Sequence, residues 1–170
     1  MSGSRSNIDI EADLARIAHQ ERELWFPSFG EQDAWRLGLS LQAVAADQQL
    51  PVVIDIQRLD RQLFYAAMPG ATFDNEDWVR RKRNVVRRFV RSSYALGLEM
   101  RLLSTTLADY YGLPAHKYAA GGGGFPIQVN GTGLVGTVTV SGLPERQDHH
   151  MVAAALWTLL GRTMPMPALD

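Results

Sequence analysis

The chain of 170 residues contains no cysteine. This absence excludes disulfide bonds, thiolate nucleophiles and cysteine-ligated zinc, iron–sulfur or haem centres. No apolar run approaches the roughly 20 residues that a membrane-spanning helix needs. The polar residues 1–7 also lack the apolar core of a secretory signal. We therefore expect a cytoplasmic protein without a membrane segment.

Recognisable chemical motifs are equally scarce. The sequence shows no nucleophile beside a matching base, no cluster of metal-ligating residues and no nucleotide-binding fingerprint. No metal site is expected, and the residues alone name neither a catalytic group nor a cofactor. Whether the protein is an enzyme therefore stays open at this level.

Charge is unevenly distributed along the chain. The formal net charge is −1, but 7 of the 17 basic residues lie between Arg80 and Arg91. The rest of the chain then holds 10 basic and 18 acidic residues. A basic helix on a mostly acidic body favours contact between copies of the chain over nucleic-acid binding. We expect Arg81 and Arg88 to lie in such a subunit contact, and we do not expect nucleic acid as a partner.

The composition, with 46% hydrophobic and 21% charged residues, fits a single domain over residues 1–170. Residues 1–7 are expected to form a disordered tail. Residues 163–170, with prolines at two positions, are expected to form an irregular one.

Hydrophobic periodicity predicts the elements of the first half. Apolar residues at helical spacing predict helices over 8–23 and 31–49, with an edge strand or extended segment at 24–29 between them. Two β-branched and aromatic runs, 51–56 and 62–67, predict a hairpin.

The basic helix follows this hairpin. Asp74 or Asn75 is expected to cap it, and Gly97 to break it before a second helical piece that ends at Gly112. Its inward residues are expected to be Trp78, Val85, Val86 and Phe89.

A second hairpin and a closing helix complete the expected fold. Asn130-Gly131 predicts a tight turn between strands at 125–129 and 134–140, the second of which has one core face by alternation. A helix is expected from Asp148 to about Leu160. Hairpins with helices before, between and after them indicate an α/β protein of the α+β type, with helices packed on an antiparallel sheet.

Four successive glycines precede the second hairpin. Such a run lets the main chain approach a ligand closely, and the start of the closing helix offers further N–H donors. The alternative is a loop that needs tight turns and close strand packing. Because the run precedes a strand and not a helix, a phosphate-binding loop is disfavoured. The candidate ligand-binding residues are Gly121, Gly122, Gly123, Gly124, Phe125, Asp148 and His149.

Several motifs in order resemble the UPF0303 family, within the wider haem-degrading domain group of GlcG-like and HbpS-like proteins. The resemblance covers roughly Leu24 to Leu160. It implies a profilin-like fold of α/β/α layers, with an antiparallel sheet of about five strands, and self-assembly into a homodimer or higher ring. The motifs are Trp78-Val-Arg-Arg-Lys-Arg-Asn-Val-Val-Arg-Arg-Phe89, Ser92-Ser-Tyr94, Gly122-Gly-Gly-Phe-Pro-Ile127, Gly136-Thr-Val-Thr-Val-Ser-Gly-Leu-Pro144 and Asp148-His149.

The group includes haem-binding proteins, so the resemblance implies a small-ligand-binding or accessory protein whose ligand is haem or a related tetrapyrrole. His149 is then the candidate axial ligand, because imidazole commonly ligates haem iron. A capping Asp148 followed by an exposed, structural His149 is the alternative. Two other functions stay open: a cofactor-free oligomeric interaction scaffold, and a small hydrolase or lyase using these two residues. If Asp55 is buried, Arg58 or Lys82 could be its partner.

Overall fold

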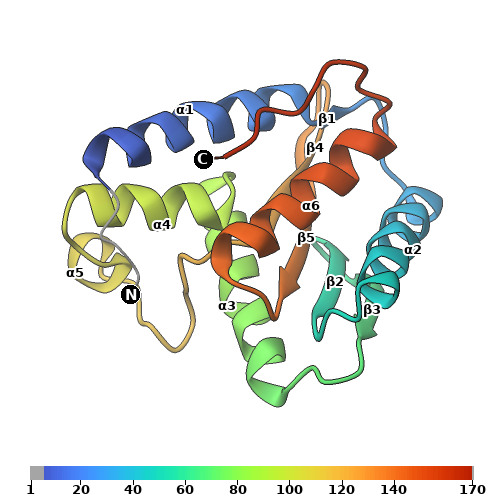
Figure 1. Cartoon of the computed structure of the whole chain (residues 1–170), viewed down its shortest axis with the longest axis horizontal. Helices are drawn as coiled ribbons and strands as arrows, with labels where there is room; N and C mark the ends of the chain where they lie inside the picture. Colours follow the sequence, from blue (N-terminus) through green and yellow to red (C-terminus); the bar gives the residue numbers. More distant parts are fainter. Residues whose placement is uncertain (1–5, 170) are drawn as a thin grey trace.

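The structure, a computed structural model, describes residues 6–169 as one layered arrangement of helices and strands (Figure 1). Most of the helices and strands lie where the hydrophobic periodicity predicts them. In chain order they are α1 (Asn7–Glu23), β1 (Trp25–Phe26), α2 (Glu31–Asp47), β2 (Val53–Arg58), β3 (Gln62–Ala67), α3 (Phe73–Phe89), α4 (Ser93–Leu102), α5 (Leu107–Tyr111), β4 (Gly124–Val129), β5 (Gly133–Ser141) and α6 (Glu145–Leu159).

The strands form a five-stranded sheet in the order β1-β4-β5-β2-β3. Both expected hairpins, β2–β3 and β4–β5, are antiparallel, and β2 joins them by pairing antiparallel with β5. The short β1 pairs parallel with β4, which makes the sheet mixed. β1 lies at an edge and is followed by Pro27, as expected for an edge strand.

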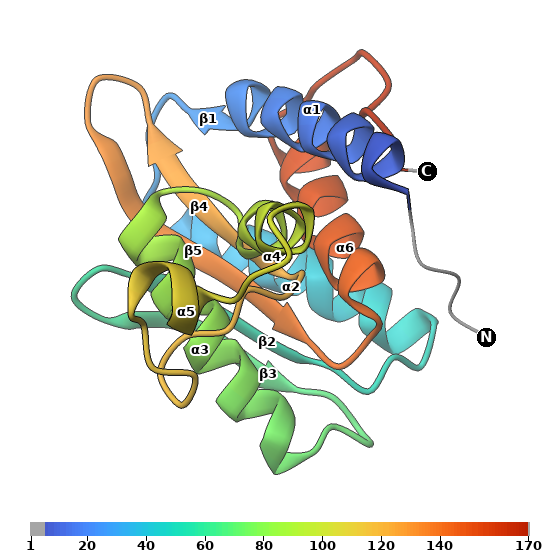
Figure 2. The same ribbon diagram turned by 90° about the vertical axis from the view of Figure 1, so that its left-hand side faces the viewer.

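Helices cover both faces of this sheet (Figure 2). On one face α2 and α6 pack against the strands, and on the other α3 packs across β5, β4 and β2. α1 packs on α4, which contacts α3, α6 and β4. The predicted fold class, an α/β protein with helices flanking a largely antiparallel sheet of five strands, is confirmed.

The main hydrophobic core lies between the sheet and the α2/α6 layer. Leu41 of α2 and Leu156 of α6 are fully buried there with Val138 of β5. The opposite face of β5 is buried as well, because α3 covers it, and Thr137 and Thr139 are 0% exposed. The expectation of a single core face on this strand is therefore wrong.

Two expected boundaries of α3 are also wrong. Thr72, not Asp74 or Asn75, is the N-cap residue, and its N–H donates to Asn75 Oδ1 at 2.8 Å. The helix ends at Phe89 because Val90 adopts a left-handed conformation with φ of 55°. The chain therefore leaves the helical path well before the glycine that was expected to break it.

Gly97 lies inside α4. A Cβ at this position would come within 2.3 Å of the Ala120 carbonyl oxygen, so the glycine permits α4 to pack closely against the loop before β4. Of the expected inward residues of α3, Val85 and Val86 are buried, whereas Trp78 is 39% exposed and is not a core residue.

The closing helix α6 begins at Glu145, with Pro144 as its N-cap residue. Asp148 is therefore a residue of the first turns and not the cap that the sequence suggested. Asp148 and His149 are both buried in this part of α6, each 1% exposed.

The two ends of the chain differ. Ser6 caps α1 by accepting a hydrogen bond from the Asp9 N–H at 3.2 Å, and Asn7 is helical, so these two residues belong to α1. Residues 1–5 of the expected N-terminal tail lie outside the described residues. No helix between residues 6 and 169 combines the length and the apolar character needed to cross a membrane.

The C-terminal segment, residues 160–169, contains no helix or strand after its first turn. Trp157 Nε1 donates to the Met164 carbonyl at 2.8 Å, and Gln20 Nε2 donates to the Pro167 carbonyl at 2.7 Å. These bonds hold the C-terminal segment against α6 and α1. Residue 170 lies outside the described part of the chain.

Candidate functional site

The glycine run leads into β4, and all four of its glycines are buried. A Cβ at Gly122 would lie 1.7 Å from the Glu145 carbonyl oxygen, and one at Gly123 would lie 2.1 Å from that of Val140. Gly123 also has a φ of 115°, which side-chain-bearing residues rarely adopt. This geometry fits the packing interpretation of the run, and ligand binding by the glycines stays a prediction.

Lys82 of α3 and Asp148 of α6 form a buried ion pair beside the glycine run. Lys82 Nζ lies 3.0 Å from Asp148 Oδ2, and neither side chain is more than 5% exposed. The ammonium also donates to the Val140 carbonyl and to Ser141 Oγ, each at 3.2 Å. The carboxylate accepts a hydrogen bond from the Leu143 N–H at 3.1 Å. The pair therefore connects α3, β5 and α6.

Burial shifts the protonation of both partners. Desolvation raises the pKa of Asp148 to about 6, although the charge of Lys82 and two backbone N–H donors oppose that shift. Desolvation also lowers the pKa of Lys82, against the attraction of Asp148. Perturbed pKa values accompany functional sites and structural ion pairs alike. The depth of this pair favours a structural role.

The side chain of His149 contacts a different part of the molecule from that of Asp148. Its Nε2 lies 2.8 Å from Gln20 Oε1, and its ring packs beside Tyr94 and Phe125. It is 1% exposed, and burial lowers its pKa to about 3. Since Asp148 and His149 have different partners, the two do not form a carboxylate–imidazole pair. A neutral imidazole in this position is also shielded from ligands at the surface.

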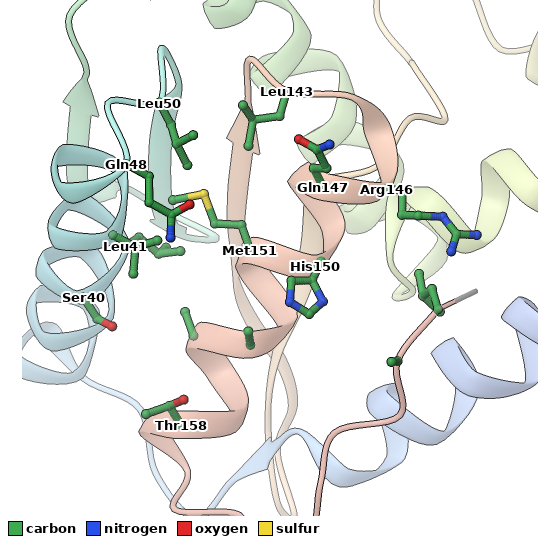
Figure 3. Close-up of a pocket in the computed structure, with 15 residues that line it drawn as sticks. Ser40, Leu41, Gln48, Leu50, Leu143, Arg146, Gln147, His150, Met151 and Thr158 are labelled. Carbon is green, nitrogen blue, oxygen red and sulfur yellow. The ribbon is translucent and has the colours of Figure 1, made fainter. Parts of the chain in front are cut away.

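A groove of about 730 Å³ lies between α2 and α6 (Figure 3). Leu41, Leu50 and Met151 contribute apolar walls, and Figure 3 shows Met151 extending from α6 toward α2. Gln48 and Gln147 are among its polar groups, and the C-terminal segment adds a further wall. A concave, mostly apolar site of this size with a few polar groups is typical of small-molecule pockets.

His150 also lines this groove and was not among the residues predicted from the sequence. It is exposed, lines the groove from α6, and has no hydrogen bond within residues 6–169. Successive helix residues point about 100° apart, so a buried His149 leaves the next side chain facing another direction. The adjacent histidines were visible in the sequence, but the burial that distinguishes them was not. No cluster of three or more potential metal ligands occurs in the same range.

The two arginines predicted at a subunit contact differ in their surroundings. Arg81 Nε lies 2.8 Å from Asp77 Oδ2, and its guanidinium stacks 4.2 Å from the Trp78 ring centre. Arg88 is exposed, with the Phe89 ring centre at 6.0 Å. Arg88 is therefore the more available of the two for a second copy of the chain, and the contact itself stays a prediction.

Asp55 in β2 is buried, and its partner is neither Arg58 nor Lys82. Arg83 Nη1 donates to Asp55 Oδ2 at 2.8 Å, and Gln62 Nε2 donates to the other carboxylate oxygen at 2.6 Å. Some basic side chains of α3 therefore point toward the sheet, whereas the sequence predicted that they would form an outward surface.

The layered sheet and the groove define an α/β/α protein with a cavity of ligand-binding size on one helical face. The profile of the family described as haem degrading protein HbpS-like matches residues 29–157. A UPF0303 protein of Burkholderia cenocepacia is 50% identical over 162 residues, which cover 95% of this chain and 98% of that protein. The chain belongs to the HbpS-like family and, within it, to the UPF0303 proteins, which confirms the resemblance seen in the sequence.

Solved structures share the same fold. The Ybr137w protein is similar with a TM-score of 0.83 and 25% identity, covering 92% of this chain and 94% of that one. A structure of PduOC in complex with haem is similar with a TM-score of 0.65 and 20% identity, covering 76% of this chain and 93% of that one. The second likeness extends to the fold alone.

Proposed function

We propose that this protein is a small-ligand-binding protein whose ligand is haem or a related tetrapyrrole, held in the groove between α2 and α6. The observation that supports the proposal is the contrast between two adjacent histidines. His149 is sealed inside, whereas His150 lines an apolar groove of about 730 Å³ with its imidazole unpaired within residues 6–169. Imidazole is a common axial ligand of haem iron.

The residues of the groove fit such a ligand. Val44, Leu50 and Met151 offer apolar contact to a flat macrocycle, and His150 offers the ligand atom for iron. Haem supplies redox-active iron when bound. The protein's part is to hold it and to set the polarity around it. The haem-bound PduOC relative supports the choice of ligand class.

The site predicted from the sequence is an alternative location for the ligand. Gly121 to Gly124, Phe125, Asp148 and His149 are buried in the single chain, so a ligand there would need the loop and α6 to separate. The open groove needs no such rearrangement, which favours it.

Haemin titration tests the proposal. The wild-type protein is expected to shift the Soret band saturably, and His150→Ala should abolish that shift while far-ultraviolet circular dichroism stays unchanged. His116→Ala, an exposed histidine outside the groove, is the matched control and should bind as wild type does. An unshifted Soret band in wild type, or an identical shift in His150→Ala, would contradict the proposal.

A cofactor-free oligomeric scaffold is the second candidate. Trp35 and Leu39 of α2 are 54% and 52% exposed, and large exposed apolar side chains on one helix are typical of contact surfaces. Native mass spectrometry separates the two candidates, since it reports retained ligand and assembly together. Among residues 6–169, Asp148 bonds to Lys82 and His149 to Gln20, so no contact between Asp148 and His149 supports the hydrolase or lyase alternative.

A further inference from the structure

The face of the sheet that α3 covers carries a row of polar side chains. The β2–β5 pairing places Asp55 opposite Thr139 and Gln57 opposite Thr137. Both threonines are 0% exposed and Asp55 is 1% exposed. Buried polar groups need hydrogen-bond partners from the protein, from ordered water or from a bound molecule. Gln62 of β3 supplies one of them by donating to Asp55.

Two arginines of α3 supply some of these partners. Arg83 Nη1 donates to Asp55 Oδ2 at 2.8 Å, and Arg87 Nη2 donates to Gln57 Oε1 at 3.1 Å. The two arginines are one helical turn apart, about 6 Å along the axis, and the two threonines are about 7 Å apart along their strand. Each arginine therefore lies over one pair of facing residues in the β2–β5 ladder.

Four polar atoms of this layer are nevertheless unpaired among residues 6–169. They are Oγ1 of Thr137 and of Thr139, and Nε of Arg83 and of Arg87. Native proteins pair nearly all buried donors and acceptors with protein, water or ligand atoms. Two atoms belong to the helix and two to the strand beneath it, so a small polar molecule between them would satisfy both sides.

The charge of the layer indicates which kind of molecule. Asp55 and Arg83 neutralise each other, whereas Arg87 has no carboxylate partner within the described part of the chain. Burial and the repulsion of Arg83 lower the pKa of Arg87, and the attraction of Asp55 opposes that shift only in part. Guanidinium N–H groups bind carboxylate and phosphate oxygens particularly well.

A cleft of about 350 Å³ leads to this layer from the side of β3. Asp55, Gln57 and Arg83 line it at the layer, and the exposed rings of Tyr65 and Phe73 line it further out. The other charged groups that line it are Glu76, Asp77 and Arg80. The cleft reaches the layer at Arg83 and offers an aromatic surface for the organic part of a small solute.

We propose that the layer between α3 and the sheet is a binding site for a small oxyanion, either a free inorganic ion or the carboxylate of a small organic acid. Nε of Arg83 and Arg87 donates to it from the helix, and the hydroxyls of Thr137 and Thr139 donate to it from β5. The site lies on the opposite side of the sheet from the α2/α6 groove, so it is independent of haem binding.

Thermal unfolding of the purified protein in sodium phosphate, sodium acetate and sodium benzoate, at ionic strength matched with sodium chloride, tests the site. An anion that binds the native state raises Tm progressively, by several degrees at about 100 times its dissociation constant. Stabilisation by phosphate alone identifies an inorganic ion. Stabilisation by acetate or benzoate identifies an organic carboxylate.

Three substitutions test whether the anion binds between α3 and the sheet. Arg87→Gln should weaken anion binding at least about ten-fold, because a charged donor is lost. Thr139→Val keeps the side-chain shape, removes only the hydroxyl, and should weaken binding in the same direction. Arg88→Gln changes an exposed arginine next in sequence and should leave binding unchanged. All three variants should bind haemin as wild type does.

Two results would overturn the proposal. The first is the absence of stabilisation by all three anions relative to chloride, which would assign the layer to ordered water. The second is an equal anion response in Arg87→Gln and Arg88→Gln, which would place the binding on the helix surface.

Discussion

Leu41 and Leu156 cover one face of the central sheet, whereas Lys82, Arg83 and Arg87 cover the other. On the first face, truncating a large buried apolar side chain to alanine is expected to cost about 2–5 kcal/mol. On the second, the cost of removing charges from water offsets much of their attraction. The α2/α6 face therefore supplies stability, whereas the α3 face determines which side chains of the helix and the sheet pair with one another.

Among the substitutions considered, Asp148→Ala on the polar face should cause the largest loss of stability. It leaves Lys82 buried without its counter-ion, which is expected to lower the free energy of unfolding by about 3–5 kcal/mol. Leu41→Ala on the apolar face should cost about 2–5 kcal/mol by opening a cavity. Urea denaturation measures both losses.

The double variant Lys82→Met/Asp148→Leu distinguishes the two causes. Because both charges are gone, most of the lost stability should return, as apolar groups of similar volume fill the space. If the double variant unfolds at as low a urea concentration as Asp148→Ala, the ion pair is not the reason for the loss.

The fold class was predictable because the patterns that encode it are local. Apolar residues at helical spacing in α2 and β-branched runs in β2 show in the sequence alone. Boundaries that depend on distant contacts were not predictable. Gly97 resembles a helix breaker, yet it lies in α4 because the Ala120 carbonyl approaches it, and Val90 ends α3 instead.

The candidate site was harder to predict for the same reason. The glycine run could be recognised as a special segment, but its close contact with Glu145 depends on the tertiary fold. Lys82 is one of several basic residues in a row, and nothing local shows that it alone of them meets Asp148. The burial of His149 depends on α1, which brings Gln20 to it across 129 positions of sequence.

Stability measured at acid pH should distinguish His149 from Asp148, its neighbour in α6. His149 has a pKa of about 3 in the folded protein against an ordinary 6.5, so below pH 6.5 the unfolded chain takes up a proton that the folded chain does not. The contribution of His149 alone therefore lowers stability as pH falls from about 6.5 toward 3, by about 3 kcal/mol at pH 4. His149→Gln removes this loss, so its stability relative to wild type should rise by that amount between pH 7.5 and pH 4.

Asp148 acts in the opposite direction over the same range. Its folded pKa of about 6 lies above the ordinary 3.8, so protonation favours the folded chain as pH falls from 6 toward 4. The two contributions partly cancel, so the stability of the wild type should change little with pH in this range. Asp148→Asn removes one of them and should make the dependence of stability on pH steeper. Parallel profiles for His149→Gln and wild type would contradict the assignment.

Arg88→Gln should have the smallest effect on stability and is the most direct test of the predicted subunit contact. The side chain is exposed, so the free energy of unfolding should change by no more than about 0.5 kcal/mol. If Arg88 contacts a second copy of the chain, the mean mass in light scattering should nevertheless fall, and high salt should lower the wild-type mass in the same way. Arg81→Gln is the matched comparison, since Asp77 already pairs with Arg81 within α3. An unchanged mass in both variants would remove these two arginines from any assembly, and the interactions of α3 would then lie with the sheet beneath it.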